Sequence, residues 1–144
     1  MIVKIHRLRP DVEIPKFHTA GAAGFDLAAA EKTEIPAGEI AMIPTGLVIE
    51  TPPGHALFLA SRSSAPKKFG LSPPHGIGVV DSDYSGPADE IKILVRNFTD
   101  QKVVIERGAR VAQGIFVKIE TATFVPDDFS GRQNRGGFGS TGGH

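Results

Sequence analysis

The sequence is organised around one central stretch, Gly76-Ile77-Gly78-Val79-Val80-Asp81-Ser82-Asp83-Tyr84-Ser85-Gly86. Val79-Val80 predicts one arm of a β-hairpin, and Ser85-Gly86 predicts the start of its turn. The closely spaced glycines leave main-chain N–H and C=O groups uncovered, so a flat ligand could lie against the backbone. Asp81 is then placed to act as a base or to hold a metal-bound water, and Tyr84 to offer its ring face to the same ligand.

The same stretch is also compatible with a plain hairpin that has a polar tip. Asp, Ser and Gly are common in turns whether or not the turn binds anything. The choice between the two interpretations therefore depends on the rest of the sequence.

Composition restricts the class of protein. The chain has 144 residues, enough for one domain with a core, and it has no Cys, which excludes disulfides and thiolate metal sites. Lys plus Arg equals Asp plus Glu at 16 each, so no overall charge favours nucleic acid or an anionic membrane. Charged residues interrupt the apolar ones in the first seven positions, unlike a secretory signal. We expect a soluble, cytoplasmic protein that binds neither nucleic acid nor membrane.

The distribution of Gly and Pro predicts an all-β fold. Gly (17) and Pro (11) make up about a fifth of the chain and separate short runs rich in Ile, Val, Leu and Phe. None of these runs keeps a helical period over three turns, whereas several alternate at strand length. Short strands with frequent turns favour a β-sandwich or a distorted jelly roll. The expected strands are Ile2–Leu8, Glu39–Ile43, Gly46–Glu50, Ala56–Ala60, Ile91–Phe98, Lys102–Ile105, Val111–Ile119 and Thr121–Val125.

One segment is expected to be helical. The run from Ser63 to Gly70 has a serine cap, Pro66 in the first turn and a glycine just past the end, which predicts a helix of one to two turns. Free N–H groups at its start, with Arg62 in front and serine hydroxyls beside them, favour an anion. A capped connector with a surface arginine fits the same residues.

The character of the chain changes at Asp127. Residues 127–144 contain six glycines and two aromatic residues, too few apolar groups to fold alone, so we expect a 1–126 domain and a flexible 127–144 arm. Arg135, Phe138, Ser140 and Thr141 lie among these glycines and could clamp phosphate and stack on a ring. A disordered tail or an Arg-Gly-Gly-type RNA-binding segment is the alternative.

Five blocks, in order, resemble the homotrimeric dUTPase family along nearly the whole chain. Each block is weak alone, and the ordered set is specific. They are Ala23-Gly24-Phe25-Asp26-Leu27, Arg62-Ser63-Ser64, Gly78-Val79-Val80-Asp81-Ser82-Asp83-Tyr84, Arg107-Gly108-Ala109-Arg110-Val111-Ala112-Gln113 and Arg135-Gly136-Gly137-Phe138-Gly139-Ser140-Thr141-Gly142.

This resemblance implies hydrolysis of dUTP to dUMP and pyrophosphate, which limits uracil in DNA and supplies dUMP for dTMP synthesis. It implies a dUTPase-like β-clip fold and a homotrimer whose active sites are shared between subunits. Asp81 would be the base that activates a water to attack the α-phosphorus, and it would also hold the sugar 3′-hydroxyl. Tyr84 would pack on the deoxyribose and exclude a 2′-hydroxyl.

The resemblance also implies how the rest of the substrate is bound. Mg²⁺ would be held by substrate phosphates and waters, with Asp26 as a catalytic aspartate that steadies one such water and with no protein residue bound to the ion directly. In the arm, Arg135 would clamp the γ-phosphate and Phe138 would stack on uracil. The phosphate ligands would be Arg62, Ser63, Ser64 and Gln113, the uracil-reading positions would be His75, Gly76, Gly78, Val79, Val80 and Lys92, and Gly139, Ser140 and Thr141 would complete the site.

Three departures from the family pattern are visible. Pro87-Ala88-Asp89 looks inserted before the strand that carries Lys92, His75 stands where many bacterial relatives have a uracil-reading Asn, and Ala65-Pro66 replaces the usual leucine after the Arg-Ser pair. At position 75 the resemblance therefore implies only that backbone groups bind the uracil.

Two other functions remain as alternatives. A dCTP deaminase shares the fold but needs a catalytic glutamate in the strand after the hairpin, where this chain has Leu94. A trimer that only binds nucleotide or RNA is the alternative without catalysis, and Asp81 with Tyr84 beside two phosphate sites disfavours it.

Overall fold

The structure, a computed structural model, describes residues 1–137 and is almost entirely β. One helix of five residues interrupts the strands of this part of the chain, as the sequence predicts. The elements in order are β1 (Lys4–Arg7), β2 (Phe25–Ala28), β3 (Thr33–Ile35), β4 (Ile40–Pro44), β5 (Leu47–Glu50), β6 (His55–Ser61), α1 (Ala65–Phe69), β7 (Leu71–Ser72), β8 (Gly78–Val80), β9 (Lys92–Asn97), β10 (Val103–Ile105) and β11 (Arg110–Lys118).

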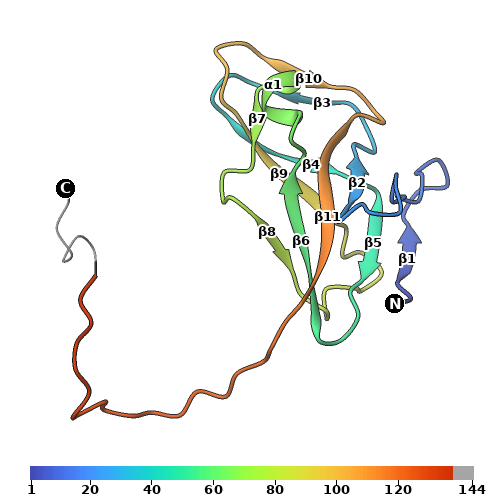
Figure 1. The fold of residues 1–144 in the computed structure, drawn as a ribbon. Coiled ribbons are helices and arrows are strands. Elements are labelled where there is room, and N and C mark those ends of the chain that lie inside the picture. The colour runs from blue at the N-terminus through green and yellow to red at the C-terminus, as the bar shows by residue number, and fades with distance from the viewer. Residues whose placement is uncertain (138–144) are drawn as a thin grey trace.

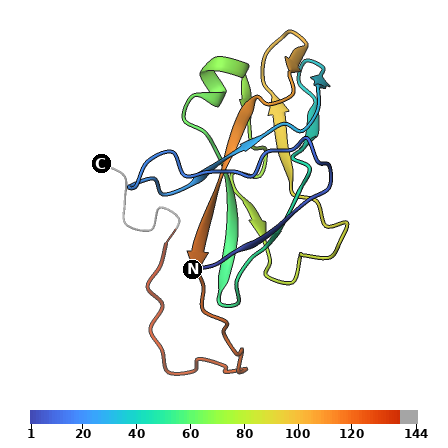
Figure 2. The same ribbon diagram turned by 90° about the vertical axis from the view of Figure 1, so that its right-hand side faces the viewer.

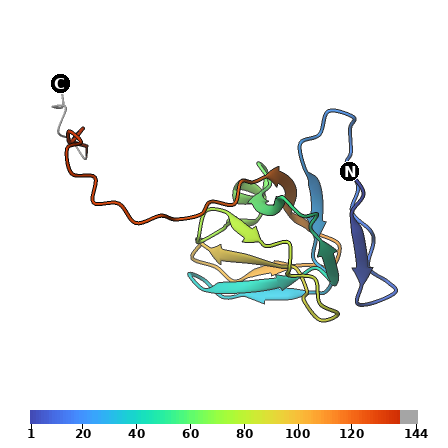
Figure 3. The ribbon, with the colours of Figure 1, turned by 90° about the horizontal axis from the view of Figure 1, so that it is seen from below.

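The strands form a sandwich of antiparallel sheets. The largest sheet has the order β2-β11-β6-β8, and the second has the order β4-β9-β7, with two further pairs, β10-β3 and β1-β5. Strands β6 and β11 run side by side through the body, paired from Ser61–Ala112 to His55–Lys118 (Figure 1). Seen from below, β3, β4 and β9 lie together in the opposite layer (Figure 3). This arrangement confirms the predicted all-β sandwich.

The core lies between these layers and is made almost wholly of aliphatic side chains. Full burial of one such side chain stabilises the fold by roughly 1.5–3 kcal/mol, so a core of this kind dominates the stability. The fully buried members are Leu27, Ile35, Ile43, Ile49, Leu57, Leu71, Ile91 and Ile105.

The predicted hairpin around Asp81 is wrong. Strand β8 pairs with β6, with Val79 opposite Phe58, whereas β9 pairs with β4 and β7. The connection between β8 and β9 therefore passes from one sheet to the other instead of folding back as a tight turn. Local sequence predicts a strand and a turn, but the partner of a strand depends on segments far away in the chain.

The strand predicted at Thr121–Val125 is absent, and β2, β3 and β7 were not expected. A strand needs a neighbour to satisfy its backbone groups, and residues 121–125 leave the body with Phe124 94% exposed. Strand β2, by contrast, alternates buried Phe25 and Leu27 with partly exposed positions. This alternation of buried and exposed positions is typical of a strand, although the same residues also form one of the family blocks.

Helix α1 begins and ends where the sequence predicts. Ser64 is the N-cap residue, but its side chain makes no capping hydrogen bond. Gly70 ends the helix in the left-handed conformation and donates its N–H to the Pro66 carbonyl at 2.9 Å. A serine therefore occupies the predicted cap position, but its side chain does not make the capping hydrogen bond.

After β11 the described chain has no regular structure, and every residue from 118 to 137 is exposed. The segment leaves the end of the body that lies opposite α1 (Figure 2). Within residues 1–137, no helix has the length and apolarity needed to cross a membrane.

Asn97 is the buried polar group that ties three segments together. Its amide nitrogen lies 3.0 Å from the Ile35 carbonyl, 3.1 Å from that of Pro36 and 2.7 Å from that of Gln101. Its amide oxygen accepts from the backbone and the hydroxyl of Thr99 at 2.9 and 2.7 Å. Because Asn97 is 0% exposed, no water replaces these bonds.

Replacing Asn97 with Ala should therefore lower the free energy of unfolding by about 2–3 kcal/mol, since the buried Ile35 carbonyl and two partly buried carbonyls lose their donor. The measurement is urea denaturation at one fixed protein concentration. Gln101→Ala is the matched control, because its exposed side chain makes none of these bonds, and it should stay within about 0.5 kcal/mol of the parent. Equal midpoints for the two variants would contradict this role of Asn97.

Candidate functional site

A cavity of about 350 Å³ opens where β8 ends. Gly78 permits close approach here, since a Cβ at this position would lie 3.1 Å from Leu59 and 3.3 Å from His75 Nε2. Asp81 follows β8 directly and is exposed to this space. The lining consists of Met42, Leu59, His75, Gly78, Val79, Val80, Asp81, Tyr84, Glu90, Ile91 and Lys92.

Strand β8 offers backbone groups to this cavity because it is the edge strand of its sheet. Its one paired neighbour in the described chain is β6, so one row of N–H and C=O groups has no strand partner. The side chain of Val79 is 60% exposed beside this edge. A planar ligand with its own donors and acceptors could bond to such an edge.

Tyr84 is held beside Asp81 by one hydrogen bond from its backbone and one from its side chain. Its N–H donates to the Asp81 carbonyl at 3.3 Å, and its hydroxyl donates to the Glu90 carbonyl at 3.3 Å. The ring remains 42% exposed and lines the cavity, as a surface for stacking requires. Of the residues predicted to read the base, His75, Gly78, Val79, Val80 and Lys92 line the same cavity. Gly76 lies between His75 and Gly78, and its N–H donates to the Pro73 carbonyl at 3.2 Å.

A second group of candidate site residues surrounds Asp26 on β2. The Asp26 side chain is only 14% exposed, and Arg62 Nε lies 2.8 Å from its Oδ1. Arg110 Nη1 and His18 Nε2 each lie 3.0 Å from its Oδ2. Two guanidinium groups against one carboxylate leave excess positive charge, which is typical of a phosphate-binding site.

The other predicted phosphate ligands lie around this group. Gln113 is opposite Asp26 in the β2–β11 pairing, and its amide donates to the Ser61 carbonyl at 3.1 Å. Ser63 and Ser64 are exposed just before α1. Arg62 points to Asp26 and to the Arg110 carbonyl, 3.2 Å away.

Within one chain the two groups lie far apart. The register places Val80 opposite Leu57, so Asp81 falls next to Ala56, six residues before Arg62. At roughly 3.3 Å per residue this separates them by about 20 Å along β6. They line different cavities, and no hydrogen bond or ion pair among residues 1–137 joins them.

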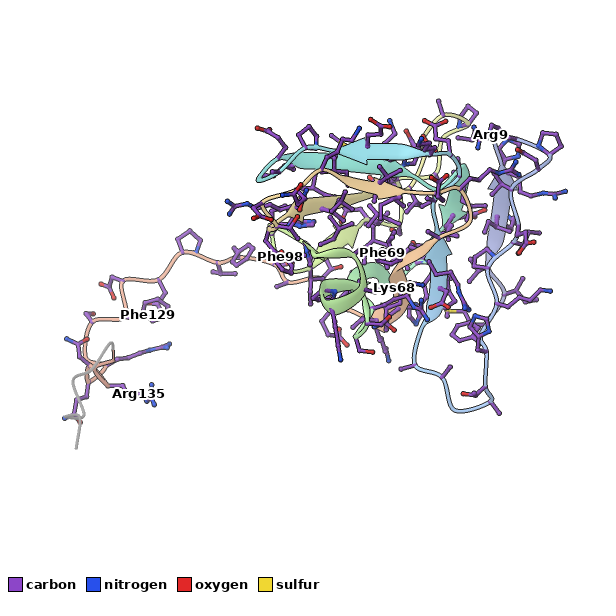
Figure 4. The ribbon with its side chains drawn as sticks, turned by 90° about the horizontal axis from the view of Figure 1, so that it is seen from above. Arg9, Lys68, Phe69, Phe98, Phe129 and Arg135 are labelled. Atoms are coloured by element: carbon purple, nitrogen blue, oxygen red, sulfur yellow. The ribbon has the colours of Figure 1, made fainter. Side chains whose placement is uncertain are left out.

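The arm residues that the structure describes, 127–137, are not near either group. Arg135 and Phe129 lie on the extended segment, well away from the body (Figure 4). Local contacts are present within the segment. The Arg132 guanidinium carbon lies 4.2 Å from the centre of the Phe129 ring, and the Ser130 N–H donates to the Asp128 carboxylate at 2.8 Å, which lowers the pKa of Asp128. The predicted ligands Phe138, Gly139, Ser140 and Thr141 lie outside the described residues.

Three residues around these groups had no predicted role: Arg110, His18 and Glu90. Arg110 belongs to the family block that contains Gln113. Its place three positions before Gln113 indicates that a second arginine, besides Arg62, lies near the predicted phosphate ligands. His18 returns to Asp26 because the intervening Thr19–Gly24 consists of small residues and glycine, which allow a tight loop. Nothing in the local sequence indicates that Glu90 contacts a distant turn.

The position that a deaminase would need is apolar. Leu94 lies on β9 opposite Met42 and offers no group that can carry a proton. The structure therefore gives no support to the deaminase alternative.

Comparison with known proteins gives one consistent family. The family model described as dUTPase matches residues 10–142. A deoxyuridine 5′-triphosphate nucleotidohydrolase of Lactococcus lactis is 44% identical over 135 residues, which cover 91% of this chain and 89% of that protein.

Solved structures agree with this assignment. A dUTPase from Streptococcus mutans is 39% identical, has a TM-score of 0.77, and covers 85% of this chain and 98% of its own. A mutant dUTPase from phage phi11 of S. aureus, whose structure shows how a structural Mg(II) ion is coordinated, shares the fold at 21% identity and a TM-score of 0.79, over 89% of this chain and 97% of its own. The predicted jelly-roll-like fold is confirmed. Because the match includes both side-chain groups and most of the arm, the chain belongs to the dUTPase family.

Proposed function

We propose that this protein hydrolyses dUTP to dUMP and pyrophosphate. The observation that carries the proposal is the cavity at the end of β8, where Asp81, Tyr84 and an open backbone edge meet. Release of pyrophosphate from dUTP, with dCTP and UTP as controls, tests it. Release from dCTP or UTP at the rate seen with dUTP would contradict it.

In this mechanism Asp81 is the general base. Its carboxylate is exposed to the cavity, where it can accept a proton from a water as that water attacks the α-phosphorus. The new P–O bond forms as the bond between the α-phosphorus and the bridging oxygen breaks, and pyrophosphate leaves. Proton acceptance by a positioned carboxylate is one of the usual forms of general base catalysis.

Selection of the nucleoside follows from the other walls of the cavity. The free edge of β8 would bond to the uracil edge, and cytosine would be rejected because its donor and acceptor at positions 3 and 4 are exchanged. Tyr84 would lie against the deoxyribose and leave no space for a 2′-hydroxyl. The exposed Val79 and Met42 side chains, at 60% and 63%, supply apolar surface around the base.

Magnesium fits this site only if the substrate supplies most of its ligands. Among residues 1–137 no group of three or more His, Asp or Glu side chains could hold an ion by itself. Mg²⁺ keeps several waters and commonly binds through substrate phosphates, so the oxygens of Asp26 would hold one of those waters. When bound, the ion would spread the negative charge that develops on the phosphates.

The active site is proposed to be shared between subunits. Asp81 and Arg62 of one chain are about 20 Å apart along β6. A triphosphate whose α-phosphorus lies beside Asp81 is too short to span this distance. The Asp26–Arg62–Gln113 group must then come from a neighbouring chain to reach the same substrate. A homotrimer supplies such a neighbour to every site with identical interfaces.

The arm is proposed to close this shared site. Residues 127–144 form a separate unit in this proposal, and Arg135 would clamp the γ-phosphate while Phe138 stacks on uracil. Residues 118–137 are all exposed, and an extended chain spans up to about 3.5 Å per residue, so the arm can extend well beyond its own subunit. Closure would exclude water and hold the α-phosphorus in line for attack.

Replacing Asp81 with Asn should lower kcat by about a thousandfold or more while leaving dUTP binding largely intact, because the amide keeps the shape of the side chain and cannot accept the proton. Steady-state pyrophosphate release and equilibrium binding measure the two effects. Asp83→Asn is the matched control on the same loop and should keep activity within about threefold of the parent. A kcat for Asp81→Asn within tenfold of the parent would exclude this base.

Removing the Tyr84 ring should weaken the discrimination between dUTP and UTP. In Tyr84→Ala the ratio of kcat/KM for dUTP to that for UTP should fall by about tenfold or more, whatever the absolute rates, since the ring no longer fills the space of a 2′-hydroxyl. An unchanged ratio would assign the discrimination to another group.

Mixed trimers test whether the arm acts on a different subunit. Asp81→Asn and a chain that ends at Pro126 should each be inactive, and co-refolding them should restore activity because some sites then contain an intact Asp81 and an intact arm. Merely mixing the two preformed trimers is the control and should give no activity. Verified mixed trimers without activity would show that each arm closes over its own Asp81.

A further inference from the structure

Glu90 connects the loop after Asp81 to a distant turn. Its side chain is only 18% exposed, and its Oε1 accepts the backbone N–H of Gly46 at 2.8 Å. Its other oxygen lies 3.9 Å from Lys92 Nζ, at the limit of an ion pair. The bond to Gly46 is therefore the closer contact of this carboxylate.

The turn that Glu90 contacts is held rigidly. Gly46 has a φ of +67°, and a Cβ there would come within 2.5 Å of Val12, so both conformation and packing require glycine. Next to it, Thr45 donates its hydroxyl to the Ile91 carbonyl at 2.6 Å, and the Ile91 N–H donates to the Leu47 carbonyl at 2.8 Å. The residue after Glu90 is thus fixed to the same turn.

The other side of Glu90 faces the site. Its backbone carbonyl accepts the Tyr84 hydroxyl at 3.3 Å, and Glu90 and Tyr84 line the same cavity. The extra residues before Glu90 close on themselves, because Gly86 donates its N–H to the Asp89 carboxylate at 2.7 Å and Asp89 donates its N–H to the Gly86 carbonyl at 3.0 Å. The inserted turn therefore leaves Glu90 in contact with both Gly46 and Tyr84.

We infer that Glu90 is a positioning residue for the choice between deoxyribose and ribose. The Glu90 carboxylate fixes its own carbonyl against the Gly46 turn, and this carbonyl fixes the Tyr84 hydroxyl and so the plane of the ring. Without the bond to Gly46 the ring can move, and the space that excludes the 2′-hydroxyl opens. This inference rests on the proposed function, since it concerns the substrate choice of that site.

Three variants test it, each assayed for kcat/KM with dUTP and with UTP. In Glu90→Ala the ratio of the two constants should fall about tenfold, while kcat for dUTP stays within about threefold because Asp81 is untouched. Glu90→Gln should keep the parent ratio, since its amide oxygen still accepts the Gly46 N–H. Tyr84→Phe retains the ring and loses the hydroxyl contact, so its ratio should fall as in Glu90→Ala.

The double variant Glu90→Ala with Tyr84→Phe separates this role from a general loss of stability. If both residues act through one contact, the double variant should show no further loss of discrimination than either single change. Additive losses, an unchanged ratio in Glu90→Ala, or a Glu90→Gln variant that behaves like Glu90→Ala would each overturn the inference. A parent protein that releases no pyrophosphate from dUTP would instead refute the proposed function.

Discussion

Strand β6 is the constraint on which the positions of both groups of candidate site residues depend. It is paired along both edges, to β11 on one side and β8 on the other, and its Leu57 is completely buried. The pairing with β8 fixes where Asp81 lies, and the end of the same strand leads directly to Arg62. A paired strand cannot shorten, so these two residues stay apart within one chain at a separation set by backbone geometry.

Electrostatics explains why the Asp26 group is stable without a ligand. An arginine cluster alone would repel itself, and a half-buried carboxylate alone would lose hydration. The contacts of Asp26 reduce the repulsion between the arginines and replace the hydration that its carboxylate loses. One of its oxygens contacts Arg62 and the other contacts Arg110. The remaining positive charge is available to an anion, while the guanidinium groups are already held in place before it arrives.

The sequence predicted which segments form strands and the helix better than it predicted which strands pair with one another. Alternation and turn residues located most strands and both ends of α1, because these depend on neighbours in the chain. The partner of β8 and the absence of a strand at Thr121–Val125 depend on which edges are free in three dimensions, and no local pattern carries that information. The ordered family blocks singled out Asp81 and Tyr84, which line one cavity, and Asp26 and Arg62, which form an ion pair. They did not single out Glu90, whose contact with Gly46 spans 44 positions.

The open edge of β8 also exposes the protein to aggregation. Uncovered N–H and C=O groups on a sheet edge can pair with a strand of any other chain, which is the first step of aggregation. Here the exposed edge is only three residues long, and it runs at once into Asp81 and Asp83, whose charges oppose an incoming strand. Asp81, which lines the cavity, and the nearby Asp83 thus act as gatekeepers, so the edge can accept a small planar molecule and still resist a polypeptide.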